Sequence, residues 1–268
     1  MSRVTGINKK ACVILPDTHF PVHDPVALEV ALRAIEVIKP ARVIHLGDLL
    51  DCEVFSAHGR RSVDEVRAES YLRKEIEPAR EMITRILKSS NYFHLIMGNH
   101  ENRVERLCAN MGPLGEQLYE MIAPELTLLA GFPKGKVGYT PYSDSKCPTQ
   151  FYKVAKDLIA VHGWSYAKQA ARAHLDAARS KSVIYGHSHR QDSTSTRDPF
   201  TNKVLKAMNF GTLSKLQPTY LHGGKPSEWT HGFGLIYHGL DKRDWTDYSI
   251  AIRNGKCVLP DGTEVRGK

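Results

Sequence analysis

Arg42-Val-Ile-His-Leu-Gly-Asp-Leu-Leu-Asp51 is the stretch of sequence that decides the fold. Its first five residues, 42–46, are mostly apolar and predict a buried strand. The chain then turns at Gly47 and places two carboxylates, Asp48 and Asp51, directly after that strand. In open α/β sheets, ligand sites lie at the carboxyl ends of the strands, so this stretch predicts a functional edge of an α/β sheet.

The same arrangement of a strand followed by polar, metal-capable residues recurs along the chain. The strands and the residues that follow them are 11–15 with Asp17 and His19, 92–97 with Asn99 and His100, 158–161 with His162, and 183–185 with His187 and His189. We expect the five loops to converge on one edge. Asp, His and Asn side chains together suit borderline divalent ions such as Mn²⁺, Fe²⁺ or Zn²⁺ rather than Ca²⁺.

Helical segments separate these strands in the first two-thirds of the chain, which predicts strands covered by helices. The expected helices are 24–39, which opens on the capping pair Asp24-Pro25, 64–88 with a kink at Pro78, 102–109 and 165–179. After residue 190 the strands 203–210, 233–237 and 245–252 follow without helices and predict an antiparallel addition. We interpret 111–153 as an insertion, with a cap over the site as its expected role, inside a single domain of residues 1–268.

Composition and charge exclude several classes of protein. Hydrophobic residues make up 41% of the chain and charged residues 25%, which excludes a disordered protein. No apolar run approaches the ~18 residues of a membrane span, and the N-terminal apolar stretch is too short for a signal peptide. Five widely spaced cysteines without a CxxC pair predict a reducing, cytoplasmic location and no disulfide framework. A net charge of +8 is consistent with a polyanionic partner.

Other common functional motifs are absent or incomplete. His100-Glu101 begins like the zincin motif HExxH, but position 104 is Val, so the second zinc ligand is missing. The chain contains no P-loop, no GxGxxG fingerprint and no GxSxG nucleophile motif. His45 and His94 lie inside predicted strands, where packed or hydrogen-bonded roles are expected.

In their order along the chain, the motifs resemble those of the calcineurin-like metallophosphoesterase superfamily. They read DxH (Asp17–His19), GDxxD (Gly47–Asp51), GNHE (Gly98–Glu101), His-Gly (His162–Gly163) and GHxH (Gly186–His189), and the resemblance covers residues 11–190. It implies a four-layer α-β-β-α sandwich of two mixed β-sheets. It also implies two divalent metal ions, with Mn²⁺ as the expected ion and Fe, Zn or Ni as alternatives.

The resemblance assigns a role to each motif residue. Asp17, His19, Asp48 and His189 would hold one ion, and Asp48, Asn99, His162 and His187 the other, with Asp48 bridging. Two ions about 3.5–4 Å apart can share a water and lower its pKa, which gives an in-line nucleophile for a phosphate ester. His100 would protonate the leaving oxygen, and Asp51 would hold or polarise His100. A purely structural role for Asp51, orienting the loop 47–51, is the alternative.

The substrate is less constrained by the motifs. Protein phosphatases of this superfamily carry Arg-Gly after GDxxD, whereas this chain has Cys52-Glu53 at that position. The GNHE motif, in contrast, matches the phosphatase form, since the related large nucleases usually read GNHD. Arg103 is the candidate for phosphate binding, together with the nearby arginines 60, 61 and 106. A solvated helix face and a basic loop are the alternative interpretation of these arginines.

Three functions remain open from the sequence. The first is a two-metal phosphodiesterase or nuclease acting on DNA, RNA or a nucleotide diester, which the net charge favours. The second is a phosphomonoesterase acting on a nucleotide, a small phosphate or a phosphoprotein, which GNHE favours. The third is a metal-bound nucleic-acid-binding module without catalysis, against which the complete ligand set argues.

Overall fold

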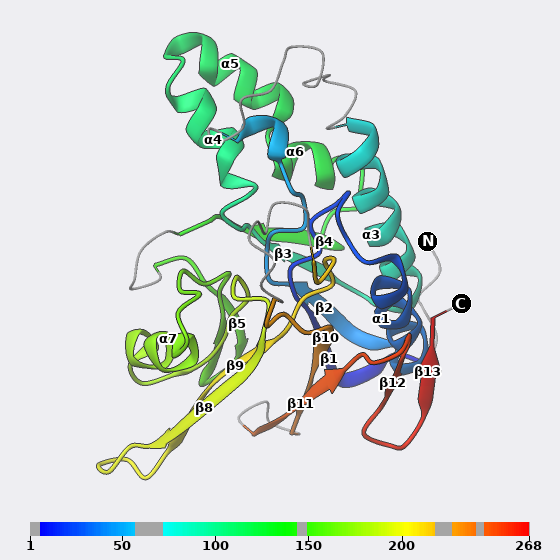
Figure 1. Cartoon of the computed structure of the whole chain (residues 1–268), viewed down its shortest axis with the longest axis vertical. Coiled ribbons are helices and arrows are strands. Elements are labelled where there is room, and N and C mark those ends of the chain that lie inside the picture. Colours follow the sequence, from blue (N-terminus) through cyan, green and yellow to red (C-terminus); the bar gives the residue numbers. More distant parts are fainter. Residues whose placement is uncertain (1–5, 57–71, 144–148, 218–226, 240–243, 268) are drawn as a thin grey trace.

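Two mixed β-sheets form the centre of the structure, a computed structural model that describes residues 6–56, 72–143, 149–217, 227–239 and 244–267 (Figure 1). The first sheet has the strand order β11-β10-β1-β2-β3-β4 and the second has the order β5-β6-β7-β9-β8, while β12 and β13 form a separate ribbon. The strands are β1 Asn8–Leu15, β2 Pro40–His45, β3 Phe93–Ile96, β4 Val137–Thr140, β5 Tyr152–Ala155, β6 Leu158–Ala160, β7 Ser182–Ile184, β8 Gln191–Arg197, β9 Val204–Phe210, β10 Gly232–His238, β11 Trp245–Ala251, β12 Lys256–Val258 and β13 Glu264–Arg266.

Helices cover the outer face of each sheet. The α-helices are α1 Pro25–Ile38, α3 Glu77–Ser89, α4 Asn102–Ala109, α5 Pro113–Ile122, α6 Pro124–Leu129 and α7 Ala170–Ala178, with a 3-10 turn at Glu53–Phe55 and a π-helical turn at Leu72–Ile76. α1 and α3 contact the first sheet and each other, and α7 contacts β7, β8 and β9 of the second sheet. α4, α5 and α6 lie together at one end of the molecule (Figure 1).

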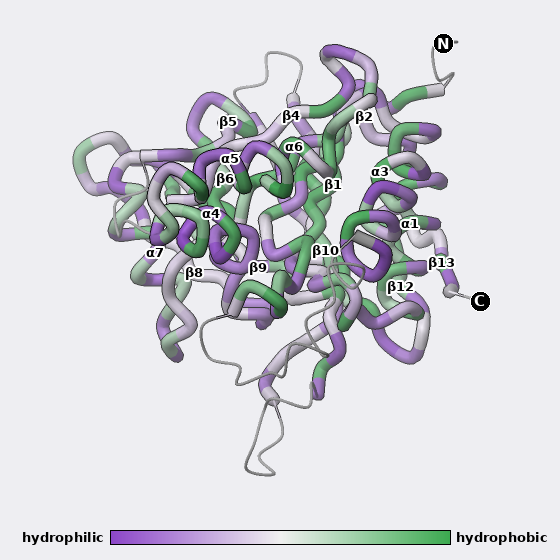
Figure 2. The backbone as a smooth tube through the Cα atoms, turned by 90° about the horizontal axis from the view of Figure 1, so that it is seen from above, coloured by the Kyte–Doolittle hydropathy of each residue, from purple (hydrophilic) through white to green (hydrophobic). Residues whose placement is uncertain are grey.

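Three apolar clusters fill the three interfaces between these layers. Alternate residues of β1 point to opposite faces: Val13 and Leu15 pack toward α1 and α3, whereas Cys12 and Ile14 pack toward the second sheet. A third cluster joins α7 to the outer face of the second sheet. Strands buried on both faces have continuous apolar sequences, which is why β1 appears as a hydrophobic segment between the layers in Figure 2. The predicted four-layer sandwich is therefore confirmed.

Parallel pairing brings the carboxyl ends of the strands to common edges. β1 pairs in parallel with β2, β2 with β3, and β3 with β4. In the second sheet β6 pairs in parallel with β7, and β7 with β9. The antiparallel pairs are β10 with β1 and β11, β5 with β6, and β8 with β9. The loops after β1, β2 and β3 therefore leave one edge of the first sheet together, and those after β6, β7 and β9 leave one edge of the second.

Local sequence signals explain the first helix. The side chain of Asp24 accepts hydrogen bonds from the backbone N–H groups of Val26 and Ala27, and Pro25 occupies the first turn. The helix ends at Lys39, which has a left-handed conformation, and Pro40 begins β2. The predicted helix over 24–39 is confirmed.

Three predicted segments differ from the structure. Residues 137–140 lie inside the expected insertion but form β4, the edge strand beside β3, and the same segment also contains α5 and α6. The added strands after residue 190 are not only antiparallel, because β9 pairs in parallel with β7. The part of the helix expected over 64–88 that precedes residue 72 lies outside the described residues. From residue 72 a π-helical turn passes into α3, in which Pro78 stands in the first turn.

No helix in the described ranges is long and apolar enough to cross a bilayer.

Candidate metal centre and active site

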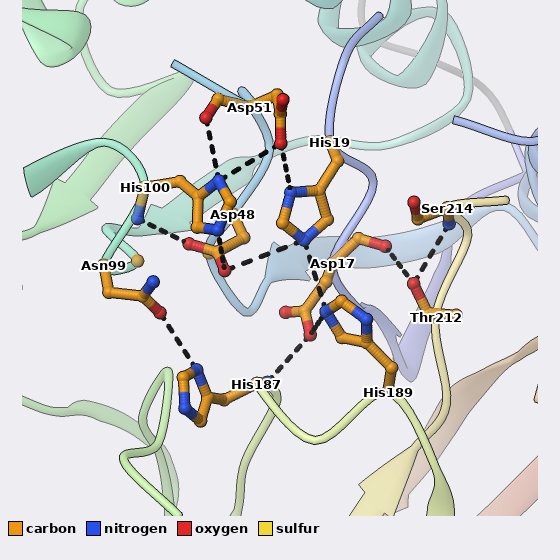
Figure 3. Close-up of polar contacts among 12 residues, drawn as sticks. Asp17, His19, Asp48, Asp51, Asn99, His100, His187, His189, Thr212 and Ser214 are labelled. Atoms are coloured by element: carbon orange, nitrogen blue, oxygen red, sulfur yellow. Dashed lines mark hydrogen bonds and ion pairs between the residues drawn. The ribbon is translucent and has the colours of Figure 1, made fainter. Parts of the chain in front are cut away.

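The loops from both sheets meet at one place, and all seven candidate metal ligands lie there. Figure 3 labels these residues except His162, which contacts Asn99. Those from the first sheet are Asp17, His19, Asp48 and Asn99, and those from the second are His162, His187 and His189. The two sets are in direct contact, since the backbone N–H of His187 donates to Oδ2 of Asp17 at 2.7 Å. The expected convergence of the five loops is confirmed, while the ligand roles of the residues stay predictions.

The first group of donor atoms comes from Asp17, His19, Asp48 and His189. Nε2 of His189 lies 3.2 Å from Nε2 of His19 and 3.2 Å from Oδ2 of Asp17. Nε2 of His19 lies 3.7 Å from Oδ2 of Asp48. Metal–ligand bonds of about 2.0–2.2 Å place neighbouring ligand atoms about 3 Å apart, so one cation fits among these atoms.

The second group comes from Asp48, Asn99, His162 and His187. Oδ1 of Asn99 lies 2.9 Å from Nε2 of His162 and 2.9 Å from Nδ1 of His187. Nε2 of His162 lies 3.4 Å from Oδ2 of Asp48, the same oxygen that faces His19 in the first group. One carboxylate oxygen therefore belongs to both groups of donor atoms, as a bridging ligand would.

Both ring nitrogens of His162 face hydrogen-bond acceptors, an arrangement that a bound cation would satisfy. Its Nδ1 lies 2.9 Å from the backbone oxygen of Leu46, which can only accept, so Nδ1 carries a proton. Its Nε2 faces the oxygens of Asn99 and Asp48, which also accept. In a neutral imidazole, the lone pair of Nε2 would face these acceptors and be repelled by them. Either a second proton on Nε2 or a metal ion bound to it removes this repulsion. The residues present thus fit a divalent ion.

The electrostatics of the site lead to the same conclusion. Burial opposes ionisation of Asp48, but His162, His100 and His19 hold its pKa well below the usual value. Burial would lower the pKa of His162, but Asp48 outweighs it and raises this pKa to about 9. Oδ1 of Asp17 is buried without a hydrogen-bond partner. The site thus concentrates buried negative charge, which a bound cation would neutralise.

His100, Asp51 and Arg103 form a second arrangement beside the donor groups. Nδ1 of His100 lies 2.8 Å from the backbone oxygen of Asp51 and 3.2 Å from its Oδ1. The same Oδ1 lies 3.1 Å from Nδ1 of His19, so Asp51 contacts both the candidate acid and a candidate ligand. Arg103 donates to the backbone oxygen of Asp51 at 2.8 Å, and its Nη2 lies 3.1 Å from Nε2 of His100.

In the described part of the chain, His19, Asp51 and His100 form a third His/Asp cluster that could hold a metal ion. Nδ1 of His100 faces the Asp51 carbonyl and so cannot itself be a ligand atom, while the role of His100 as the acid stays a prediction. Burial would lower the pKa of His100, but Asp48 and Asp51 raise it above the usual value, which favours a proton on the ring.

Strained backbone conformations mark the site. Four candidate ligands have a positive φ, 55° at His19, 48° at Asp48, 68° at His187 and 57° at His189. Non-glycine residues adopt this region rarely and at a cost, and they cluster at functional sites. Gly98 has a different role, because a side chain there would collide with the Asp48 carboxylate.

Glu101 holds the loops of the site together, a role that we did not predict. Its Oε2 accepts from the backbone N–H groups of Asp48 at 3.0 Å and Gly98 at 2.8 Å, and its Oε1 accepts from Leu50 at 2.8 Å. Burial, reinforced by the charge of Asp48, raises the pKa of Glu101 to about 7. A buried Glu75 has a related function, since it accepts from the backbone N–H of Cys52 at 2.7 Å. Neither role is visible in the sequence, because the partners are backbone groups.

Residues at the end of β9 and directly after it also support the site, although they lie beyond the motifs. Thr212 Oγ1 and the backbone N–H of Leu213 both donate to the backbone oxygen of Asp17, at 2.9 Å and 2.8 Å. Asn209 Nδ2 donates to the backbone oxygen of Gly186 and to Oγ of Ser188. Thr212 and Leu213 follow the predicted strand 203–210, which places them near the site, but the sequence does not show their role because their partner is a backbone group.

Glu101→Gln should destabilise the fold by about 2 kcal/mol. Gln presents one oxygen and one NH₂ group to three backbone donors, so at least one buried N–H loses its acceptor, at a cost of about 1–3 kcal/mol. The measurement is urea unfolding of metal-free protein, with Glu105→Gln, exposed on α4, which begins directly after Glu101, as the control. Equal unfolding midpoints for both variants would show that these hydrogen bonds do not hold the loops.

The other residues considered in the sequence are arginines near the motifs, two histidines inside strands and the cysteines. Arginines 60 and 61 lie outside the described residues, and Arg106 is exposed on α4. His45 and His94 are buried and hydrogen-bonded, to Thr18 at 2.9 Å and to Thr140 at 2.8 Å, as expected. The four cysteines that the described ranges contain are buried and free, and none of them belongs to the donor groups.

Comparisons with known proteins agree with this geometry. Residues 12–191 match the family model described as calcineurin-like phosphoesterase. The Gene 54 proteins of Mycobacterium phages L5 and D29 are 26% and 27% identical to the chain over 246 and 242 residues, which is 85% of this chain and 88% of each relative.

Solved structures with a related fold are more distant. A Vps29 mutant from Entamoeba histolytica is 12% identical, with a TM-score of 0.45, over 96% of this chain and 99% of that one. YfcE, a phosphoesterase from E. coli, is 16% identical, with a TM-score of 0.36, over 89% and 98%. A Pseudomonas putida nuclease, MPE, is 13% identical, with a TM-score of 0.34, over 89% and 91%.

Proposed function

The chain belongs to the calcineurin-like phosphoesterase family, and from that premise we propose that it is a two-metal-dependent phosphodiesterase acting on nucleic acid or a nucleotide diester. The observation that carries the proposal is the pair of donor groups sharing Oδ2 of Asp48, beside the His100–Asp51 pair. The donor set contains Asp, His and Asn but no cysteine, which favours Mn²⁺ over soft metals.

The donor residues would hold the two ions in two sets. Asp17, His19, Asp48 and His189 would hold one ion, and Asp48, Asn99, His162 and His187 the other. When bound, two such ions lower the pKa of a water molecule and neutralise charge on phosphoryl oxygens. Asn99 contributes a neutral oxygen, which limits the negative charge that an anionic substrate meets.

His100 would act on the leaving group. The Asp51 carbonyl accepts from Nδ1, which fixes the ring and leaves Nε2 to face the substrate. Arg103 lies next to Nε2 and would bind a phosphoryl oxygen, so that the substrate replaces His100 as a partner of its guanidinium. The chain thus has a guanidinium at the site although Cys52-Glu53 stands where phosphatases carry Arg-Gly.

The same guanidinium favours a second candidate function, a phosphomonoesterase. A monoester carries more charge than a diester, and an arginine beside the general acid would stabilise that extra charge. The net charge of +8 favours the diester of a polyanion instead.

Activity should require added divalent metal, with Mn²⁺ as the best activator. The test exposes chelated and reconstituted protein to bis-p-nitrophenyl phosphate, p-nitrophenyl phosphate and labelled single- and double-stranded DNA, with metal content measured in parallel. Hydrolysis of the diester and of DNA supports the proposal, and hydrolysis of the monoester alone supports the second function. Full activity after verified metal removal would exclude the two-metal mechanism.

A further inference from the structure

Tyr166 is an exposed aromatic residue at the edge of the candidate metal centre. Its side chain is 77% exposed, so the ring is accessible to a bound molecule. Its ring centroid lies 5.9 Å from that of His187, a candidate ligand of the second group. The residue lies in the loop that follows β6, four positions after the candidate ligand His162. A planar group bound next to the metal centre would therefore be within reach of this ring.

Arg190 fixes the position of the Tyr166 loop. Its Nη2 donates to the backbone oxygens of Tyr166 at 3.0 Å and Ala167 at 2.6 Å. Its Nη1 donates to Oε2 of Glu228 at 3.1 Å, which joins the loop to the segment before β10. Since Arg190 directly follows His189, the backbone that carries the exposed ring is held against the same loop that carries two candidate ligands.

A second aromatic ring stands beside the other histidine of that loop. The ring of Trp229 lies 4.1 Å from the ring of His189, in an edge-to-face arrangement. Aromatic rings thus lie beside both histidines of the loop after β7, whereas His100 and Arg103 follow β3 of the first sheet. Between these groups lies His19, whose ring contacts both His100 and His189.

This arrangement separates two parts of a phosphodiester. If the leaving oxygen faces His100, the ester group that stays on phosphorus is free to extend toward His187 and Tyr166. An exposed aromatic ring beside a phosphate site is a stacking surface for a nucleobase, and stacking tolerates every base because each has a π face. The exposed Lys168, two residues further along, adds positive charge for a neighbouring phosphate.

We propose that Tyr166 stacks on the nucleobase of the ester group that stays on phosphorus, and that this makes nucleoside phosphodiesters the preferred substrate class. The proposal rests on the proposed function, because it needs a phosphodiester held at the metal centre. It goes beyond it by distinguishing nucleoside esters from other phosphate esters.

Two diesters with the same leaving group test the proposal with the Mn²⁺-loaded protein. Thymidine 5′-(p-nitrophenyl phosphate) has a base, whereas methyl p-nitrophenyl phosphate has none. Tyr166→Ala should lower the ratio of kcat/KM for the thymidine ester to that for the methyl ester about tenfold, mainly through KM, within the range of base stacking. Tyr166→Phe, which keeps the ring, should preserve the ratio. An unchanged ratio in Tyr166→Ala would overturn the proposal.

Phe200 supplies the matched control. It is 95% exposed in the β8–β9 hairpin, at the opposite end of β9 from the residues that contact Asp17, so Phe200→Ala should change neither rate. A second measurement limits turnover by using the Mn²⁺-loaded His100→Asn variant: fluorescence anisotropy of a labelled dT₁₀ strand should show about tenfold weaker binding when Tyr166→Ala is added to it, and no change when Phe200→Ala is added.

The kinetic ratio and the binding of dT₁₀ together distinguish the stacking role of Tyr166 from the phosphodiesterase function. If the native protein hydrolyses neither diester but Tyr166→Ala still binds dT₁₀ more weakly, the phosphodiesterase function fails and the stacking role stands. If both esters are hydrolysed and neither the ratio nor the binding changes, the stacking role fails and the phosphodiesterase function stands.

Discussion

Asp48→Asn should reduce turnover by more than about 10³-fold while the fold is kept. Asn can still accept from the backbone N–H of His100, which donates to Oδ1 of Asp48 at 2.9 Å. It loses the charge on Oδ2, the atom that faces both His19 and His162. Removal of one group that stabilises the transition state typically costs 10²–10³-fold, and a bridging ligand affects two ions at once.

The readouts for Asp48→Asn are metal content, turnover and thermal stability. The variant should lose at least one metal equivalent, and added Mn²⁺ should raise its unfolding temperature less than that of the native protein, because a ligand stabilises only the state that binds it. Asp176→Asn, an exposed change on α7, should match the native protein in all three. A variant with both ions bound and near-normal turnover would show that Asp48 does not bridge.

His100→Asn should keep both metals and lose activity according to the leaving group. General acid catalysis contributes about 10²–10⁴-fold when the leaving oxygen needs a proton. An alkoxide from a sugar needs one, whereas a nitrophenoxide scarcely does. The loss should therefore be about 10²-fold or more on alkyl esters and far smaller on nitrophenyl esters.

Paired kinetics on the two ester types, with metal analysis of the same samples, decide the role of His100. The nitrophenyl ester serves as an internal control for folding and metal loading. Equal slowing of both esters, or loss of a metal ion, would exclude His100 as the acid.

The sequence predicted the strands that are buried on both faces and also the edge strand β11, but missed other strands such as β8. β1 and β2 have continuous apolar stretches because layers cover them on both sides. β8, Gln191–Arg197, contains no apolar residue and still pairs along its length with β9. Backbone hydrogen bonds to β9 specify such an edge strand, and they leave no periodic apolar signal in the sequence.

The candidate site also contains some residues that could be predicted from the sequence and others whose roles could not. Residues whose side chains point to a shared centre, such as Asp48 and His162, could be predicted because each follows a strand. Glu101 and Thr212 could not be assigned their roles, because they act on backbone groups of loops far away in the sequence. Only the folded chain shows which loops meet.

The contact between Asp17 and His187 spans 170 positions of the chain, and the contact between His19 and His189 spans the same separation. Contacts this distant form only after the intervening chain has been ordered, since closing a long loop costs entropy that local contacts do not repay. During synthesis, the first 161 residues would carry Asp17, Asp48 and Asn99 but neither complete set of donor atoms. Metal loading would therefore be among the last events of folding, and the metal content of a sample would report the fraction of molecules that have finished it.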